Sequence, residues 1–283
     1  SPLFALAGFI LFIGAIPSFR KVSKAYYFWM VLFAAAFPVG YIIYKGSNLY
    51  DGMRQVLFVY PPMIVLGSLA FNQIYERLGN KSLKIGAGVA LAGLMALPLS
   101  FMVKNHPNQY VYFNELLGGV DEAYGEYELD YWANSTKQAA NWLGSHISEK
   151  NPLDSTVRVK SNFTHNTRAV IQRHSDSFHV SYVKFRERSQ KNYDYAVFIL
   201  RFIPINILKN HWPPKGTIHQ VKVDGTPIAT IVKRNNYHDL KGHKHLKNQE
   251  FQKAIGHSEK YRQYDPKNED VLFALGRCYM RTR

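Results

Sequence analysis

Acidic residues are scarce at the start of this sequence, where the first 103 residues contain only Asp51 and Glu76. Four stretches of this part contain no charged side chain at all: residues 2–19, 25–44, 55–75 and 85–103. Each has about the 20 residues that a helix needs to cross roughly 30 Å of hydrocarbon. None alternates polar and apolar residues as a barrel strand does. Since only helices and closed barrels satisfy their backbone in lipid, the pattern predicts four spans of an integral membrane protein.

Cysteine is almost absent as well, and Cys278 alone excludes an internal disulfide or a cysteine metal cluster. The sequence has no glycine-rich phosphate loop, nucleophile elbow or zinc-ligand spacing. His238, His243 and His245 lie in a lysine-rich segment, residues 235–247, and could ligate a metal. Because no carboxylate or cysteine completes a ligand set, a solvated linker is favoured there. The sequence therefore requires no cofactor and leaves only a divalent cation open.

Basic residues, by contrast, are in excess, and the net charge is +15. Residues 1–103 hold 8 Lys and Arg against 2 Asp and Glu, and the remaining residues hold 27 against 18. A basic surface beside a membrane favours anionic lipid headgroups or a phosphorylated ligand. Nucleic acid is not an expected partner, because no recognised binding motif accompanies the charge.

The distribution of positive charge predicts the orientation of the spans. Six cations lie in the first and third connections: Arg20, Lys21, Lys24, Arg77, Lys81 and Lys84. The second connection carries only Lys45 and Arg54. Cytoplasmic loops collect Lys and Arg, so residues 45–54 and everything after Lys104 are expected to face the outside.

The apolar part, residues 1–104, is followed by a small extracytoplasmic α/β domain at 105–234. Apolar residues at helical spacing predict a helix over 137–148. Short runs rich in β-branched and aromatic residues predict strands at 156–160, 178–183, 195–200, 217–223 and 228–232. Asp224-Gly225, between the last two strands, is typical of a hairpin turn. Residues 235–249 are predicted to be a linker.

Residues 250–283 predict two helices around a turn at 265–268. The spacing of a few positions resembles a tetratricopeptide repeat, with the second helix of one unit followed by the first helix of the next: Ala254, Tyr261, Pro266, Leu275, Gly276 and Tyr279. A plain helical hairpin is the alternative. The expected fold class is thus a polytopic α-helical membrane domain, an α/β domain and a C-terminal helical, tetratricopeptide-like hairpin.

Two weaker patterns lie in the α/β region. His165, Arg168, Arg173 and His174 form a basic cluster that could face headgroups or a sugar, but a solvated helix face is favoured. Residues 134–136 and 162–164 match N-glycosylation sequons, which matter only in a eukaryotic lumen.

The connection before the third span contains polar groups that could bind a phosphate. Tyr50, Asp51, Gly52 and Arg54 lie together at the expected outer surface of the membrane. A guanidinium at the start of a helix can bind the phosphate of a lipid in two hydrogen bonds, in a favourable helix field. An ordinary interfacial ion pair between Asp51 and Arg54, with snorkelling side chains, is the alternative.

Three segments in order resemble the GT-C membrane glycosyltransferases, and most closely the protein-mannosyltransferase-like group, glycosyltransferase family 39. Residues 50–62, Tyr-Asp-Gly-Met-Arg followed by an aromatic run and Pro-Pro, resemble a late outer loop and its helix. Residues 106–114 with Gly118-Gly119 resemble the segment after the next span. Residues 128–132, Glu-Leu-Asp-Tyr-Trp, resemble the start of the soluble domain of bacterial relatives.

The resemblance implies transfer of a sugar from a polyprenyl-phosphate carrier to a glycan or protein acceptor on the outer face of a bacterial inner membrane. Arg54 would bind the carrier phosphate, Asp51 would shape the site and Tyr50 would line it. Gln55 stands where many relatives have His, which weakens an acid–base role there. The catalytic carboxylate of the family lies in a first outer loop that this sequence lacks.

We therefore expect Ser1 to be an internal position of a longer protein, with further helices and the unknown catalytic base upstream, and the chain to be inactive alone. We likewise expect further sequence after Arg283. A membrane-anchored scaffold, whose C-terminal repeats bind a partner protein, is the alternative function. A transporter is weaker, because the spans hold no charged residue to couple an ion.

Overall fold

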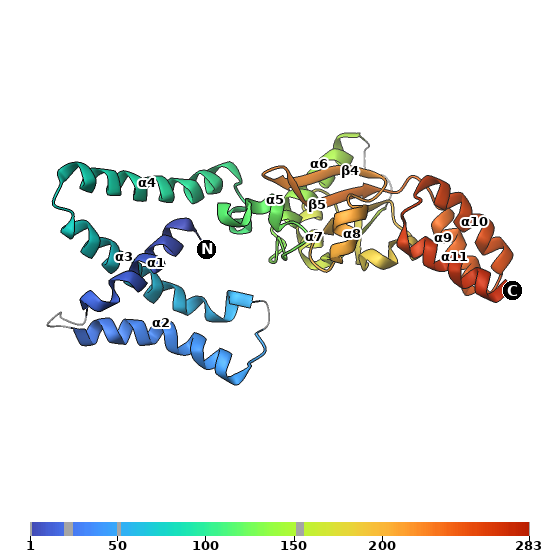
Figure 1. The fold of residues 1–283 in the computed structure, drawn as a ribbon. Helices are drawn as coiled ribbons and strands as arrows, with labels where there is room; N and C mark the ends of the chain where they lie inside the picture. Colours follow the sequence, from blue (N-terminus) through green and yellow to red (C-terminus); the bar gives the residue numbers. More distant parts are fainter. Residues whose placement is uncertain (1, 20–24, 50–51, 151–155, 283) are drawn as a thin grey trace. The chain divides into compact units, whose positions relative to one another are not determined.

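The computed structural model describes the whole chain except residues 1, 20–24, 50–51, 151–155 and 283 (Figure 1). The chain divides into two compact units. One contains residues 1–104 and 112–117, and the other contains residues 105–111 and 118–283.

The first unit is helical. Its elements are α1 (Leu3–Phe19), α2 (Ala25–Lys45), the 3-10 helix η1 (Gly52–Val59), α3 (Tyr60–Arg77), α4 (Lys81–Lys104) and the short 3-10 turn η3 (Glu115–Leu117). Among the described residues, three stretches are long and apolar enough to cross a membrane: Tyr26–Lys45, Gln55–Arg77 and Lys81–Lys104. The predicted first span also forms an apolar helix, but its stretch Leu3–Ile16 is shorter than the other three. Three of the four expected spans are thus confirmed as helices of suitable length and composition.

Small residues bring α1 and α3 together. A Cβ atom built on Gly67 would lie 3.0 Å from the backbone carbonyl carbon of Gly8, which is tighter than most real Cβ contacts. Phe12 on α1 and Leu66 on α3 are almost fully buried beside this contact. Lipid tails provide no hydrophobic drive for helix association, so close backbone packing of this kind is what holds such helices together.

The third span begins with an irregular segment. A Pro-Pro pair within the predicted span 55–75 suggests a kink, but Pro61 and Pro62 occupy the first turn of α3. Proline fits there because the first N–H groups of a helix have no partner inside it. The irregularity lies earlier, in η1, where Val56 has non-helical angles, φ −115° and ψ 17°.

The second unit contains a five-stranded mixed sheet. The strands are β1 (Val157–Ser161), β2 (Phe178–Tyr182), β3 (Tyr195–Ile199), β4 (Thr217–Val223) and β5 (Thr226–Lys233), in the order β2-β1-β3-β5-β4. β1 runs parallel to β2 and β3, whereas β5 runs antiparallel to β3 and β4. All five predicted strands are confirmed. Asp224 and Gly225, both at positive φ, form the predicted hairpin turn between β4 and β5.

Helices and turns flank this sheet: η2 (Gln109–Val111), α5 (Gly119–Ala123), α6 (Ser135–Lys150), α7 (Thr164–Ile171), η4 (Phe185–Gln190) and α8 (Ile205–His211). Helix α6 contains the predicted helix 137–148 and buries Ala139, Ala140 and Leu143 completely. Helix α6 packs against β3, β4 and β5, and α7 packs against β1 and β2. These contacts form the core of the α/β region.

Three helices follow: α9 (His238–Lys247), α10 (Phe251–Tyr264) and α11 (Glu269–Thr282), which pack on one another (Figure 1). The two helices predicted for residues 250–283 are confirmed. The predicted linker at 235–249 is wrong over most of its length, because α9 fills it. The lysines that suggested a solvated segment occupy one side of α9, while Gly242 on the other side lies close against Ser258 of α10.

Buried ion pairs anchor these helices to the α/β region. Arg234, after β5, donates to the Asp239 carboxylate of α9 at 2.7 Å, and both side chains are 2 % exposed. Burial outweighs the attraction of Arg234 and raises the pKa of Asp239 to about 6. Arg188 on η4 binds Glu269 of α11 through two hydrogen bonds, 2.6 and 3.0 Å long. Helices α9 to α11 therefore pack on the α/β region and belong to the same unit.

Candidate functional sites

The predicted donor site is described only in part. Tyr50 and Asp51 fall outside the described residues, and for Arg54 only the backbone is described, within η1. Its place three residues into this 3-10 helix agrees with the expectation that Arg54 lies where the third span begins.

The helical unit also contains an apolar groove. It has a volume of about 560 Å³ and is formed by α1, α3 and α4. Small residues make the space: Gly8 on α1, Gly67 on α3, and Ala87 and Ala90 on α4 all line it. Its remaining walls are apolar apart from Ser68, whose hydroxyl bonds back to the Ile64 carbonyl at 2.9 Å. The groove thus suits a hydrocarbon chain.

Two of the segments that resemble the glycosyltransferases meet at Asp130 in the second unit. The Tyr110 and Ser135 hydroxyls and the Asn134 backbone N–H donate to this carboxylate, the last at 2.9 Å. Asp130 is 1 % exposed and has a positive φ of 52°. The turn 130–134 therefore fixes the start of α6.

The same contacts restrict the chemistry of Asp130. Burial raises the pKa of its carboxyl, although the hydrogen bonds from Ser135 and Tyr110 oppose the shift. Burial and the nearby Asp130 charge also raise the pKa of Tyr110, so its hydroxyl stays protonated and donates. With both of its oxygens engaged by donors, Asp130 fits the role of a structural acceptor better than that of a general base.

An exposed aromatic surface lies beside this turn. The Arg201 guanidinium lies 3.9 Å from the centre of the Tyr131 ring and 4.7 Å from that of Phe202, and it donates to the Tyr131 carbonyl at 3.0 Å. Trp132 and Phe202 are 58 % and 65 % exposed. Stacking on aromatic rings holds the cation in place at the surface.

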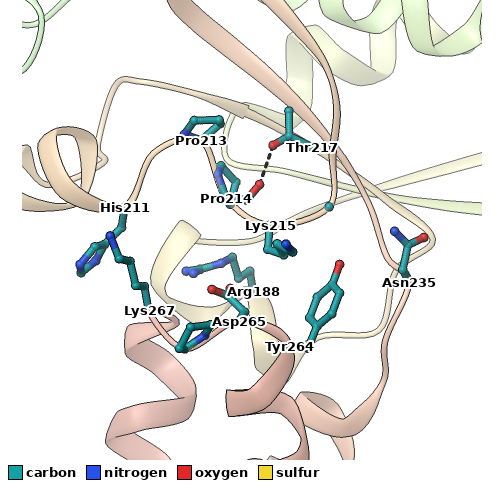
Figure 2. Close-up of a pocket in the computed structure, with 12 residues that line it drawn as sticks. Arg188, His211, Pro213, Pro214, Lys215, Thr217, Asn235, Tyr264, Asp265 and Lys267 are labelled. Carbon is teal, nitrogen blue, oxygen red and sulfur yellow. Dashed lines mark hydrogen bonds between the residues drawn. The ribbon is translucent and has the colours of Figure 1, made fainter.

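A polar cleft opens between the α/β region and the C-terminal helices (Figure 2). Its volume is about 620 Å³. Figure 2 shows His211 and Lys267 at one side of the cleft, Asn235 at the other, and Lys215, Asp265 and Tyr264 between them. The Nδ1 atom of His211 is buried and has no hydrogen-bond partner in the described structure. The cleft therefore offers donors, acceptors and one aromatic ring to a polar ligand.

The histidines considered for a metal have other contacts. Nδ1 of His238 lies 2.8 Å from Nδ1 of His257, His245 contacts the Glu250 carboxylate, and His243 lies 3.4 Å from Asp270. Within the described ranges, no group of three or more His, Cys, Asp or Glu side chains could hold a metal ion.

The remaining sequence candidates are not brought together as a site. His165, Arg168, Arg173 and His174 are exposed on and after α7, and Arg168 donates to the Val180 carbonyl at 2.7 Å. The Asn162 sequon is unsuitable for a glycan, because its side chain is buried and bonded to the Ile199 carbonyl at 2.9 Å.

The sequence did not single out Asp130, Arg201 or the residues of the polar cleft. Asn134-Ser135 before an amphipathic helix is a helix-start pattern that could have pointed to the turn at Asp130. Comparisons with protein-family models, curated proteins and solved structures found no match.

Proposed function

We propose that this chain is the C-terminal part of an integral membrane glycosyltransferase. The enzyme would transfer a hexose from a polyprenyl-phosphate donor to an acceptor outside the membrane, in a bacterial inner membrane. The observation that carries the proposal is the sequence of residues 50–54, which precedes an apolar stretch, together with Arg54 lying in the 3-10 helix that leads into α3. Arg54 would bind the carrier phosphate, with Asp51 and Tyr50 beside it.

The apolar groove supports a lipid-linked donor. A polyprenyl chain is a linear run of methyl-branched isoprene units, and a groove lined by small and aliphatic residues accepts such a chain without unpaired polar groups. A water-soluble nucleotide sugar has no hydrocarbon chain that could bind in this groove.

The polar cleft of Figure 2 supports an acceptor role for the outer domain. Sugars and peptides are bound through several hydrogen bonds and an aromatic contact, and Asn235, Asp265 and Tyr264 offer these groups. The general base would be a carboxylate contributed by sequence outside this chain.

The test is donor kinetics of the full-length protein carrying Arg54→Ala or Arg54→Lys. We expect Arg54→Ala to raise the KM for the polyprenyl-phosphate sugar by about tenfold or more, since a charge-assisted bidentate contact is lost. Arg54→Lys should lie between, because Lys keeps the charge but not the paired geometry.

Arg77→Ala at the other end of α3 is the matched control and should leave donor KM unchanged. Donor kinetics equal to wild type in Arg54→Ala would remove Arg54 from the site.

A membrane-anchored scaffold is the second candidate, favoured by an apolar stripe on α11. Leu272, Phe273, Tyr279 and Met280 are 42–73 % exposed along this helix. A transferase should retain polyprenyl phosphate through purification, whereas a scaffold should retain a stoichiometric protein partner. Mass spectrometry of lipid and protein in the purified sample separates the two.

A further inference from the structure

The C-terminal helices form a groove that the proposed transfer reaction does not use. We call it the basic groove: it lies between α9, α11 and the end of η4 and has a volume of about 1060 Å³. Lys244 and Lys247 line it from α9, Arg277 and Arg281 from α11, and Lys191 from the chain after η4. Residues three or four apart share a helix face, so each helix presents two cations to the groove.

These five cations are not neutralised within the described structure. None forms an ion pair there, and the groove lining includes no carboxylate from the described ranges. The nearby carboxylates are engaged elsewhere: Asp239 by Arg234, Glu269 by Arg188, Glu259 by Arg262, and Glu250 by His245 and Lys253. Unpaired cations gathered in a concave surface create a focused positive potential.

Asp270 does not cancel this potential. Its side chain is 4 % exposed, accepts a hydrogen bond from Gln190 at 2.8 Å, and lies 3.4 Å from Nε2 of His243. This arrangement holds Gln190 and His243, both of which line the groove, in fixed positions. The lining is thus preorganised, and the positive side chains remain free to meet a ligand.

The shape and the apolar part of the lining indicate the ligand. Leu240, Leu246 and Phe251 lie among the cations. A flat membrane surface cannot enter a concave groove, and single-stranded nucleic acid binds through stacking on several aromatic rings, of which this lining has one. An extended peptide fits, since its alternate side chains can place carboxylates on the cations and apolar groups on Leu240, Leu246 and Phe251.

We propose that the basic groove binds an acidic protein segment in which carboxylates alternate with apolar residues. The cations of the groove would attract the carboxylates of the segment, and Leu240, Leu246 and Phe251 would contact its apolar side chains. This inference does not depend on the transferase activity, because it concerns different residues and a macromolecular partner.

The test uses the whole chain in phosphatidylcholine nanodiscs and a fluorescent peptide of alternating glutamate and leucine. We expect saturable binding at about 0.1 M salt that weakens as ionic strength rises, since screening shortens the reach of the charges. The double variant Lys244→Glu/Arg277→Glu should weaken binding by about tenfold or more, because two attractions become repulsions. Both side chains are exposed, so the fold should persist.

The matched control is Lys222→Glu/Lys260→Glu, which changes net charge equally at exposed sites outside the groove. It should bind the peptide like wild type. Equal weakening in both double variants, or no weakening in the groove variant, overturns the proposal. Tighter, groove-dependent binding of oligothymidylate, or of vesicles of phosphatidylglycerol, would also overturn it and assign the groove to nucleic acid or lipid.

Discussion

At the scale of single residues, Asp130 shows how a buried carboxylate serves a fold. Its carboxylate accepts hydrogen bonds from two hydroxyl groups and one backbone N–H, which belong to three different residues. Tyr110 also accepts a hydrogen bond from the backbone N–H of Trp132 at 3.2 Å, so the network closes around the turn. The network stabilises the turn because it supplies acceptors to donors that would otherwise lack partners.

This role predicts the effect of Asp130→Ala. The substitution leaves Tyr110, Ser135 and the Asn134 N–H without their acceptor. The Ser135 hydroxyl is buried and the other two donors are partly buried, and a buried unpaired donor costs about 1–3 kcal/mol. We expect the free energy of unfolding to fall by about 3 kcal/mol, visible as a lower Tm by tryptophan fluorescence.

Glu128→Ala removes the same charge two residues away from an exposed position and is the control. It should leave the Tm unchanged. If Asp130→Ala were as stable as this control, the three hydrogen bonds would contribute little.

At the scale of elements, the contact of α1 with α3 depends on the absence of two side chains. The Gly8 and Gly67 backbones approach so closely that a Cβ on either would lie 3.0–3.2 Å from the other. A side chain there must push the helices apart, and overpacking of this kind costs about 1–3 kcal/mol.

We therefore expect Gly67→Val to lower the Tm of the detergent-solubilised protein and to reduce cross-linking between α1 and α3. Gly93→Val on α4 introduces the same β-branched residue where no atom lies within 4 Å, and it should have a much smaller effect. Equal losses in the two variants would mean that helix propensity, rather than the contact, sets the stability.

The elements also show what the sequence could predict. Strands β1 to β5 and helices α6, α10 and α11 were predictable, because hydrophobic periodicity and the Asp224-Gly225 turn are local signals. Helix α9 was not, since it is held by contacts that hydrophobic periodicity does not reveal: the buried ion pair of Asp239 with Arg234, and the packing of Gly242 against Ser258 of α10. The start of α3 was misjudged because proline breaks a helix only when a preceding turn exists.

The candidate sites divide in the same way. Arg54 could be selected from a short contiguous segment. The polar cleft and the basic groove could not, since each combines residues from the α/β region and the C-terminal helices. Two of the cations in the basic groove lie on α9, and the lysine-rich sequence of α9 was predicted to be a linker.

At the scale of the whole molecule, the distribution of positive charge predicts an orientation that can be measured. Single cysteines at Ser47 and Ser82, both exposed, would report on the second and third connections. With Cys278 replaced by alanine, an impermeant maleimide added to intact cells should label Ser47→Cys. It should label Ser82→Cys only after the membrane is opened.

Lys222→Cys, on the β4 strand, extends the measurement to the second unit and should behave like Ser47→Cys. The reverse labelling pattern would place the loop before α3, and with it the proposed donor site, in the cytoplasm.

The 3-10 form of η1 has a consequence for depth in the bilayer. A 3-10 helix rises about 2.0 Å per residue and an α-helix about 1.5 Å, so the path from Arg54 to Tyr60 is longer by about 3 Å than a continuous α-helix would make it. The headgroup region on each side of a bilayer is only about 5–7 Å thick. Tightening the helix before Pro61 therefore moves the Arg54 backbone across roughly half of that layer. The winding of one short segment thus sets how much water surrounds the proposed phosphate-binding position.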